Sequence, residues 1–142
     1  MRDKGVMKLY RTSRKLYLNK IPTIPKIIKN FIRVVYAATI PYTVEIGKNT
    51  KFPHGAQGVV LNDNCIIGND CIISAGVIIG GKSGTKSVPI IGNNVVVGAN
   101  STIIGNVKIG DGAIIGAGSV VVKNVAANTV VVGNPAKPIS KK

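Results

Sequence analysis

The sequence predicts a mainly β protein: a parallel β solenoid preceded by a short basic helical segment. From residue 61 onward an aliphatic side chain recurs at every sixth position, and glycine, asparagine and aspartate cluster between these positions. Aromatic residues are scarce, tryptophan is absent, and valine and isoleucine supply most of the apolar content. Such a composition is typical of many short strands joined by tight turns and excludes a helical bundle.

The six-residue period identifies the kind of β fold. It is too long for the alternation of one strand and does not fit the helical period. It fits a coil with three flat sides, in which the aliphatic residue points inward and glycine, asparagine or aspartate takes the positive φ of a corner. Coils stacked at the strand spacing of about 4.8 Å then share one apolar column. The alternative is a glycine-rich β sandwich, which does not explain why the aliphatic residues keep the same six-residue spacing. The series is Leu61, Ile67, Ile73, Ile79, Ile91, Val97, Ile103, Ile109, Ile115 and Val121.

Two details of the repeat carry further predictions. Only Thr85 breaks the series, inside the polar stretch KSGTKSVP (82–89), which predicts a loop. A small or β-branched residue follows each aliphatic position by four places, and both cysteines, Cys65 and Cys71, fall there. We therefore expect the cysteines to pack inside the solenoid, with no disulfide, metal pair or nucleophilic role.

Residues 1–40 lack the repeat and are read as a basic helical segment, separate from the solenoid at 41–142. This segment holds ten of the 19 basic residues, and Asp3 is its only acid. The prolines of IPTIP (21–25) must interrupt any helix, and 26–38 then predicts a second one. One face of that helix is expected to gather Ile27, Ile28, Phe31, Ile32 and Val35, with Lys26, Lys29 and Arg33 at its edges.

Two roles for this segment remain open from the sequence. It can cap the open end of the solenoid, or it can contact an anionic membrane surface as a peripheral element. Nucleic acid is not expected as a partner, because aromatic residues are not interleaved with the basic ones and no nucleic-acid motif is present. No signal peptide and no apolar run of about 18 residues is found, which predicts a cytoplasmic protein, at most at the inner face of the membrane.

His54 is the only histidine, and it sits where the six-residue rhythm fails. In FPHGAQGVV (52–60) the inward position passes from Phe52 to Leu61, a gap of nine residues rather than six. A loop or bulge must therefore form there, and Gly55 and Gly58 give its backbone freedom. A turn of this kind lets the His54 side chain leave the wall of the solenoid. Imidazole exchanges protons near neutral pH, so it suits a general base.

The motifs resemble a known family. The pattern [LIV]-G-x-x-[small]-x is that of the left-handed parallel β-helix acyltransferases. The order of IGKNTKFPHGAQGVVL, VIIGGKSG, ANSTIIGNVKIGDGAIIGAGSVVVKNV and VVGNPAKPI, over about 44–139, resembles the serine acetyltransferase branch. The resemblance implies left-handed winding, acetyl-CoA as acetyl donor without a metal, and a homotrimer with active sites between subunits.

The resemblance also implies roles for single residues. His54 corresponds to the catalytic base of this branch, which takes the proton of an acceptor hydroxyl during direct attack on the thioester. Residues expected to bind the coenzyme are Gly80, Gly81, Ala99, Ala117, Val122, Lys123 and Lys137. A zinc carbonic anhydrase, found on the same fold, needs three histidine ligands or their equivalents, which a single histidine does not supply.

Two departures from the serine acetyltransferase pattern concern the acceptor side. A second histidine of that branch is replaced here by Val88, in TKSVP, and an aspartate that supports the base is replaced by Thr39. With the basic N-terminus, these departures favour a sugar acceptor, nucleotide- or lipid-linked, in capsule, O-antigen or exopolysaccharide synthesis. Serine O-acetylation in cysteine biosynthesis is the alternative, and a non-catalytic β-helix scaffold is the alternative from another class.

Overall fold

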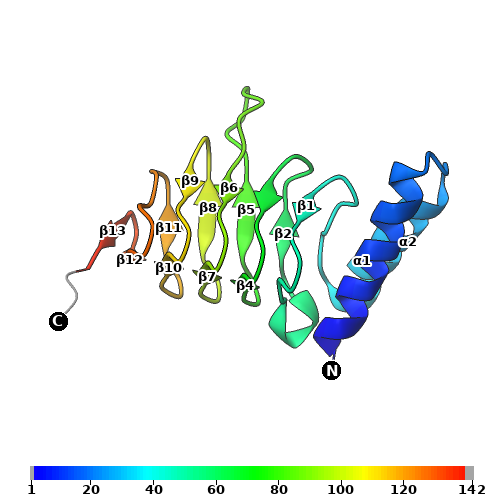
Figure 1. Cartoon of the computed structure of the whole chain (residues 1–142), viewed down its shortest axis with the longest axis horizontal. Coiled ribbons are helices and arrows are strands. Elements are labelled where there is room, and N and C mark those ends of the chain that lie inside the picture. Colours follow the sequence, from blue (N-terminus) through cyan, green and yellow to red (C-terminus); the bar gives the residue numbers. More distant parts are fainter. Residues whose placement is uncertain (1, 140–142) are drawn as a thin grey trace.

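The computed structural model describes residues 2–139, of which residues 2 and 3 are described by their backbone alone. Two helices, α1 (Arg2–Leu18) and α2 (Ile24–Tyr36), precede a solenoid of short strands. The helices stand together at one end of the solenoid, and the C-terminal hairpin forms the other end (Figure 1). A short 3-10 turn, η1 (Pro53–Ala56), interrupts the solenoid near its start.

The strands form three sheets, one for each side of the coil, and all pairs within them are parallel except β12–β13. We name each sheet by one of its strands. The β3 sheet holds β1 (Glu45–Ile46), β3 (Ile66–Ile67), β6 (Ile90–Ile91) and β9 (Lys108–Ile109). The β2 sheet holds β2 (Val60–Leu61), β5 (Ile78–Gly80), β8 (Thr102–Ile104) and β11 (Val120–Val121). The β4 sheet holds β4 (Ile72–Ile73), β7 (Val96–Val97), β10 (Ile114–Ile115), β12 (Val130–Gly133) and β13 (Ala136–Pro138).

The strand register confirms the six-residue period. Val60 pairs with Ile78, so one coil takes 78 − 60 = 18 residues, or six for each of three sides. Lys51 pairs with Ile72, which gives 72 − 51 = 21, because η1 adds three residues to that coil. Ile66 pairs with Ile90, which gives 90 − 66 = 24, because the loop before β6 adds six. This loop projects from the upper edge of the solenoid (Figure 1).

The core is the apolar column that the sequence predicts. Every aliphatic residue of the series from Leu61 to Val121 is at most 2% exposed, and Ile46 and Phe52 continue the column toward the helices. The small positions are buried as well, including Cys65, Cys71, Ser101 and Ser119. The strands are only two to four residues long because the corners take up the rest of each hexapeptide.

Asparagine, aspartate and glycine occupy the corners, as expected. Asn49, Asp70, Asn94 and Asn128 have φ between 54° and 58°, a left-handed conformation that these residue types adopt more readily than most. Gly98 shows a second use of glycine, because a β-carbon there would lie 2.5 Å from the backbone nitrogen of Ala117 in the next coil. Corner glycines thus permit positive φ at some positions and close stacking of coils at others.

Helix α1 caps the open end of the solenoid, one of the two roles left open above. The buried Tyr10 hydroxyl donates to the Val44 carbonyl, and the Arg14 guanidinium donates to the carbonyls of Tyr42 and Thr43 at 3.0 and 3.1 Å. Arg11 donates to the Gly47 carbonyl at 2.7 Å. Free carbonyls of the first coil thereby gain donors that no preceding coil supplies.

The predicted apolar face of α2 is only partly correct. Ile32 is fully buried and Ile28 is half-buried, but Ile27, Phe31 and Val35 are exposed. The apolar arc of this helix is wider than the strip that packs on α1. In residues 2–139 no helix is both long enough and apolar enough to cross a bilayer.

Candidate functional site

Turn η1 lifts His54 out of the solenoid wall. Three successive residues, His54, Gly55 and Ala56, have φ of 58°, 69° and 59°. Phe52 before them and Val59 after them are fully buried, so both ends of the turn are anchored in the core. The His54 side chain is exposed while Gly55 and Ala56 are buried beneath it. The three inserted residues therefore form a turn that projects from the wall and exposes the imidazole.

The imidazole lines a hollow between this turn and the end of α2. The hollow has a volume of about 250 Å³, and its other walls are Val35, Tyr36, Ala37, Gly55 and Gln57. Gly58 N–H donates to the Ala37 carbonyl at 2.9 Å, which holds the two walls together. Sequence reasoning missed Tyr36 and Gln57, since no periodic pattern links the end of a helix to a turn about 20 residues later.

The imidazole makes no hydrogen bond within the described residues 2–139. Thr39, at the position of the supporting aspartate, forms a β-bridge with Val60, and its N–H donates to the Val59 carbonyl at 2.8 Å. Thr39 thus holds the strand that follows the turn. Val88 is half-buried against the core near Gly81, away from the hollow.

One corner of the solenoid joins the His54 turn to two of the expected coenzyme residues. Gly76 N–H donates to the Gln57 carbonyl at 2.9 Å, and Asn100 N–H donates to the Ala75 carbonyl at 3.0 Å. Gly118 N–H then donates to the Ala99 carbonyl at 2.8 Å. Ala99 and Ala117 therefore lie on the same edge as His54, between the β4 and β2 sheets. We call this edge the histidine edge.

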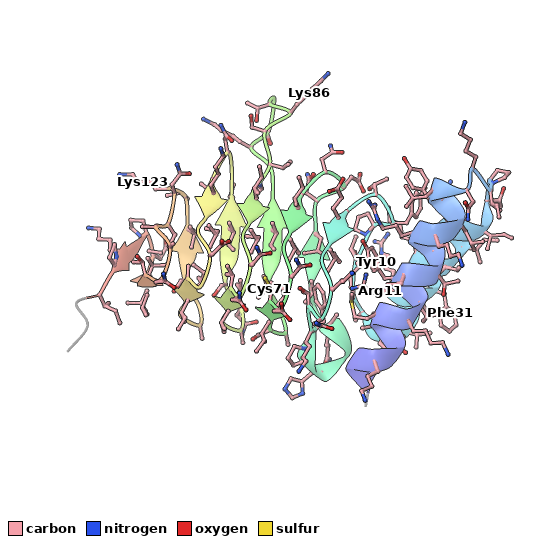
Figure 2. The ribbon with its side chains drawn as sticks, viewed as in Figure 1. Tyr10, Arg11, Phe31, Cys71, Lys86 and Lys123 are labelled. Atoms are coloured by element: carbon pink, nitrogen blue, oxygen red, sulfur yellow. The ribbon has the colours of Figure 1, made fainter. Side chains whose placement is uncertain are left out.

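The other expected coenzyme residues lie along the opposite edge of the β2 sheet. Gly80 is the last residue of β5 and Gly81 follows it, while Val122 and Lys123 follow β11. Between them, Gly105 N–H donates to the Gly80 carbonyl at 3.1 Å. Lys123 and Lys86, at the tip of the projecting loop, point outward from this edge (Figure 2). We call it the loop edge. Within one chain the expected residues thus form two groups, not one.

Lys137 lies on the C-terminal hairpin. It is exposed on β13 and pairs with Val132 of β12. Gly133 N–H at the hairpin donates to the buried Ser119 hydroxyl oxygen at 3.2 Å, which fixes the hairpin to the corner that carries Ala117. Lys137 is therefore held at the far end of the histidine edge.

The cysteines have the packing role expected for them. Burial raises the pKa of Cys65 to about 12, and burial also raises the pKa of Cys71. The Cys71 thiol donates to the Gly92 carbonyl at 3.1 Å inside the wall (Figure 2). Raised pKa values keep both groups as thiols at neutral pH, which removes the nucleophilic form. Among the described residues, no group of three or more His, Cys, Asp or Glu side chains can hold a metal ion.

Comparisons with known proteins agree with the fold. Residues 89–123 match the family model "Bacterial transferase hexapeptide (six repeats)". The serine acetyltransferase of Synechococcus elongatus is 37% identical over 87 residues, which cover 60% of this chain and 35% of that protein. The solved serine acetyltransferase of Neisseria gonorrhoeae with serine has a TM-score of 0.91 and 36% identity, over 97% of this chain and 57% of that one. This chain is similar to the serine acetyltransferase branch of the hexapeptide-repeat transferases.

A second solved serine acetyltransferase, in complex with CoA, gives a TM-score of 0.87 at 30% identity, over 94% of this chain and 55% of that one. These structures share the left-handed β-helix, which confirms the handedness expected from the motifs. The chain spans about a third of the length of the curated relatives that it matches and somewhat more than half of the solved chains.

Proposed function

We propose that this chain is an acetyl-CoA-dependent O-acetyltransferase in which His54 is the general base. The observation that carries the proposal is the exposed imidazole on a turn of positive φ, at the start of the histidine edge, which also holds Ala99 and Ala117. The similarity to serine acetyltransferases, one of them solved with CoA, supports it. A scaffold would need the solenoid but not a histidine turn beside a hollow.

Acetyl transfer to a hydroxyl group requires one proton acceptor. Acetyl-CoA is an activated thioester, whereas an alcohol is a weak nucleophile at neutral pH because its proton is held tightly. The imidazole takes this proton as the hydroxyl oxygen attacks the acetyl carbonyl, and it returns the proton to the departing CoA sulfur. General base catalysis of this kind contributes about 10²–10⁴-fold in rate. A backbone N–H of the glycine-rich corners is the expected donor to the tetrahedral oxyanion.

Transfer is direct, without an acetyl-enzyme. Cys65 and Cys71 are buried, and the raised pKa of each keeps it protonated at neutral pH. The acetyl group then passes from sulfur to the acceptor oxygen in one chemical sequence at a single site.

A homotrimer is part of the proposal, because it would reunite the two groups of coenzyme residues. A β-helix packed side by side with its copies around a threefold axis can set the histidine edge of one subunit against the loop edge of the next. The outward positions of the sheets suit such contacts: Val60, Ile78, Ile72 and Ile114 are each between 37% and 42% exposed. CoA would then lie between Ala99 and Ala117 of one copy and Gly80, Gly81, Val122 and Lys123 of its neighbour.

Serine is the acceptor that the comparisons favour, since the curated relatives are serine acetyltransferases. A sugar hydroxyl, the first expectation from the sequence, has no support among these comparisons. It rests on Val88 and Thr39, which stand where the branch carries polar partners for the acceptor and the base. The hollow of about 250 Å³ beside His54 is the place where either acceptor would bind.

The test is thiol release from acetyl-CoA by the purified chain, with L-serine and a panel of nucleotide- and lipid-linked sugars as acceptors. Acceptor-dependent release with serine supports the proposal as stated. Release with sugars alone supports the acetyltransferase and reassigns its acceptor. Release no faster than spontaneous thioester hydrolysis with every acceptor contradicts the enzymatic function.

A further inference from the structure

The outer face of α2 carries an apolar stripe that nothing in the described residues 2–139 covers. Ile24, Ile27, Phe31, Val34 and Val35 are all at least 47% exposed, and Val34 reaches 83%. Their spacing of three or four residues places them on one side of the helix. Phe31 lies on the side of the helical pair turned away from the solenoid (Figure 2). Isolated exposed apolar side chains are common, but a continuous stripe indicates an interaction surface.

The stripe is distinct from the part of α2 that packs on α1. Pro25 and Ile32 are buried on the packed side, and the Ser13 hydroxyl donates to the Pro25 carbonyl at 2.9 Å across the helical pair. Two further apolar residues are exposed at the inter-helix turn, Ile21 at 37% and Leu18 at 62%. The helical pair therefore holds together without the stripe, which is free to bind something else.

Positive charge lies on the side of α2 opposite to the stripe. Lys26, Lys29 and Arg33 lie in a row on the polar side of α2, and Lys15 and Lys20 are exposed around the inter-helix turn. Between residues 4 and 40 the sequence has no acidic residue. An apolar helix face backed by a polar face rich in lysine and arginine is the arrangement of helices that lie in the headgroup region of anionic membranes.

We propose that the outer face of α2 docks onto an anionic lipid surface, with the helix lying in the plane of the interface. The apolar stripe would enter the headgroup boundary, and the net positive charge of residues 4–40, which hold nine basic residues and no acidic one, would attract the anionic surface. A second copy docked through this same face is a poorer occupant, since residues 4–40 of each copy carry nine basic residues and no acidic one, and the two segments would repel each other. The helix is too short to span a bilayer, so the contact is peripheral.

The docking also has a geometric consequence. Val35, the last residue of the stripe, lines the hollow that holds His54. A membrane against α2 therefore brings the lipid surface close to the hollow in which the acceptor would bind. This consequence rests on the proposed function, whereas the docking itself does not.

The experiment is co-sedimentation of the full chain with vesicles of phosphatidylcholine alone or of phosphatidylcholine with phosphatidylglycerol. We expect binding to the anionic vesicles that weakens as salt rises, and little binding to the neutral ones. The double variant Phe31→Asp/Val34→Asp removes two apolar anchors and should reduce binding by about tenfold or more. Both positions are on the surface, so the variant should fold, which circular dichroism checks.

Matched controls separate a docking face from general charge. Ile90→Asp changes an aliphatic residue of similar exposure on the β3 sheet and should leave binding unchanged, as should Lys86→Glu at the loop tip. Lys26→Glu/Arg33→Glu should weaken binding. Equal binding by wild type and Phe31→Asp/Val34→Asp overturns the proposal, as does absence of binding to anionic vesicles. A change in oligomeric state in that variant, measured by light scattering, would instead identify α2 as a contact between copies and would also overturn it. Thiol release in solution is measured in parallel, so loss of docking and loss of catalysis are told apart.

Discussion

Gly76 N–H donates to the Gln57 carbonyl at 2.9 Å, and this bond joins the histidine turn to the first regular corner of the solenoid. Without it the three inserted residues of η1 would form an independent loop. With it, the turn becomes the first member of a ladder that continues through Ala75 and Ala99 to Gly118. The position of His54 therefore depends on how tightly the coils below it stack.

Gly98→Ala should destabilise the fold, because the new β-carbon would lie 2.5 Å from the Ala117 nitrogen, a backbone atom that cannot turn aside. We expect a loss of about 1–3 kcal/mol in the free energy of unfolding, measured by urea denaturation. Gly80→Ala is the matched control, since a β-carbon there meets nothing within 4 Å. Its stability should stay within about 0.5 kcal/mol of wild type. Equal losses in the two variants would contradict the tight stacking at this corner.

Arg14→Ala should lower the free energy of unfolding by about 1–3 kcal/mol, because two half-buried carbonyls, those of Tyr42 and Thr43, lose a charged donor. Glu45→Gln should cost little, since the Arg14–Glu45 ion pair spans 3.9 Å and the carboxylate is 64% exposed. Thermal unfolding of both variants checks this order. A larger loss in Glu45→Gln would mean that the ion pair, not the carbonyl contacts, holds the cap.

Stability should fall at alkaline pH because of the buried thiols. Burial raises the pKa of Cys65 from 9.0 to about 12, so the folded thiol keeps its proton where the unfolded thiol loses it. The stabilisation is full below pH 9 and is lost between about pH 9 and 12, at up to about 1.4 kcal/mol per pH unit. Urea midpoints at pH 8 and pH 10 should differ less in Cys65→Ala than in wild type. An unchanged difference would contradict burial of this thiol.

Lys137→Ala should raise the KM for acetyl-CoA by about tenfold with little change in kcat, because a point charge against a phosphate contributes to binding rather than to the chemical step. The effect should shrink as salt rises. Lys86→Ala, at the tip of the projecting loop, is the control of equal charge. Equal changes in KM for the two variants would show that Lys137 acts through net charge alone.

Much of the fold is predictable from the sequence because every coil of the solenoid has the same six-residue pattern. Each inward position from Leu61 to Val121 obeys the same six-residue pattern, so single exceptions such as Thr85 stand out as loops. The failure of the pattern at 53–60 likewise predicts the turn that presents His54. What repeats is predictable because neighbouring coils impose the same environment on equivalent residues.

The rest depends on contacts that do not repeat. Tyr36 and Gln57 line the same hollow because α2 ends beside η1, and no pattern in either segment predicts the other. The exposure of Ile27 and Phe31 is not predictable for a related reason. The sequence shows that one side of α2 is apolar, but not how much of that side α1 covers. The coenzyme residues lie on two edges because their hexapeptides end at different corners of the coil. The six-residue pattern is the same on all three sides, so it does not tell which corner a given hexapeptide forms.

The most direct test of the account is the rate of thiol release by His54→Asn. Asparagine tolerates the positive φ of 58° at this position but cannot act as a base, so the variant should keep the fold and lose the chemistry. We predict an unchanged urea midpoint and a kcat lower by about 10²–10⁴-fold with serine or the active acceptor. A folded His54→Asn variant with wild-type kcat would contradict the assignment of His54 as the base.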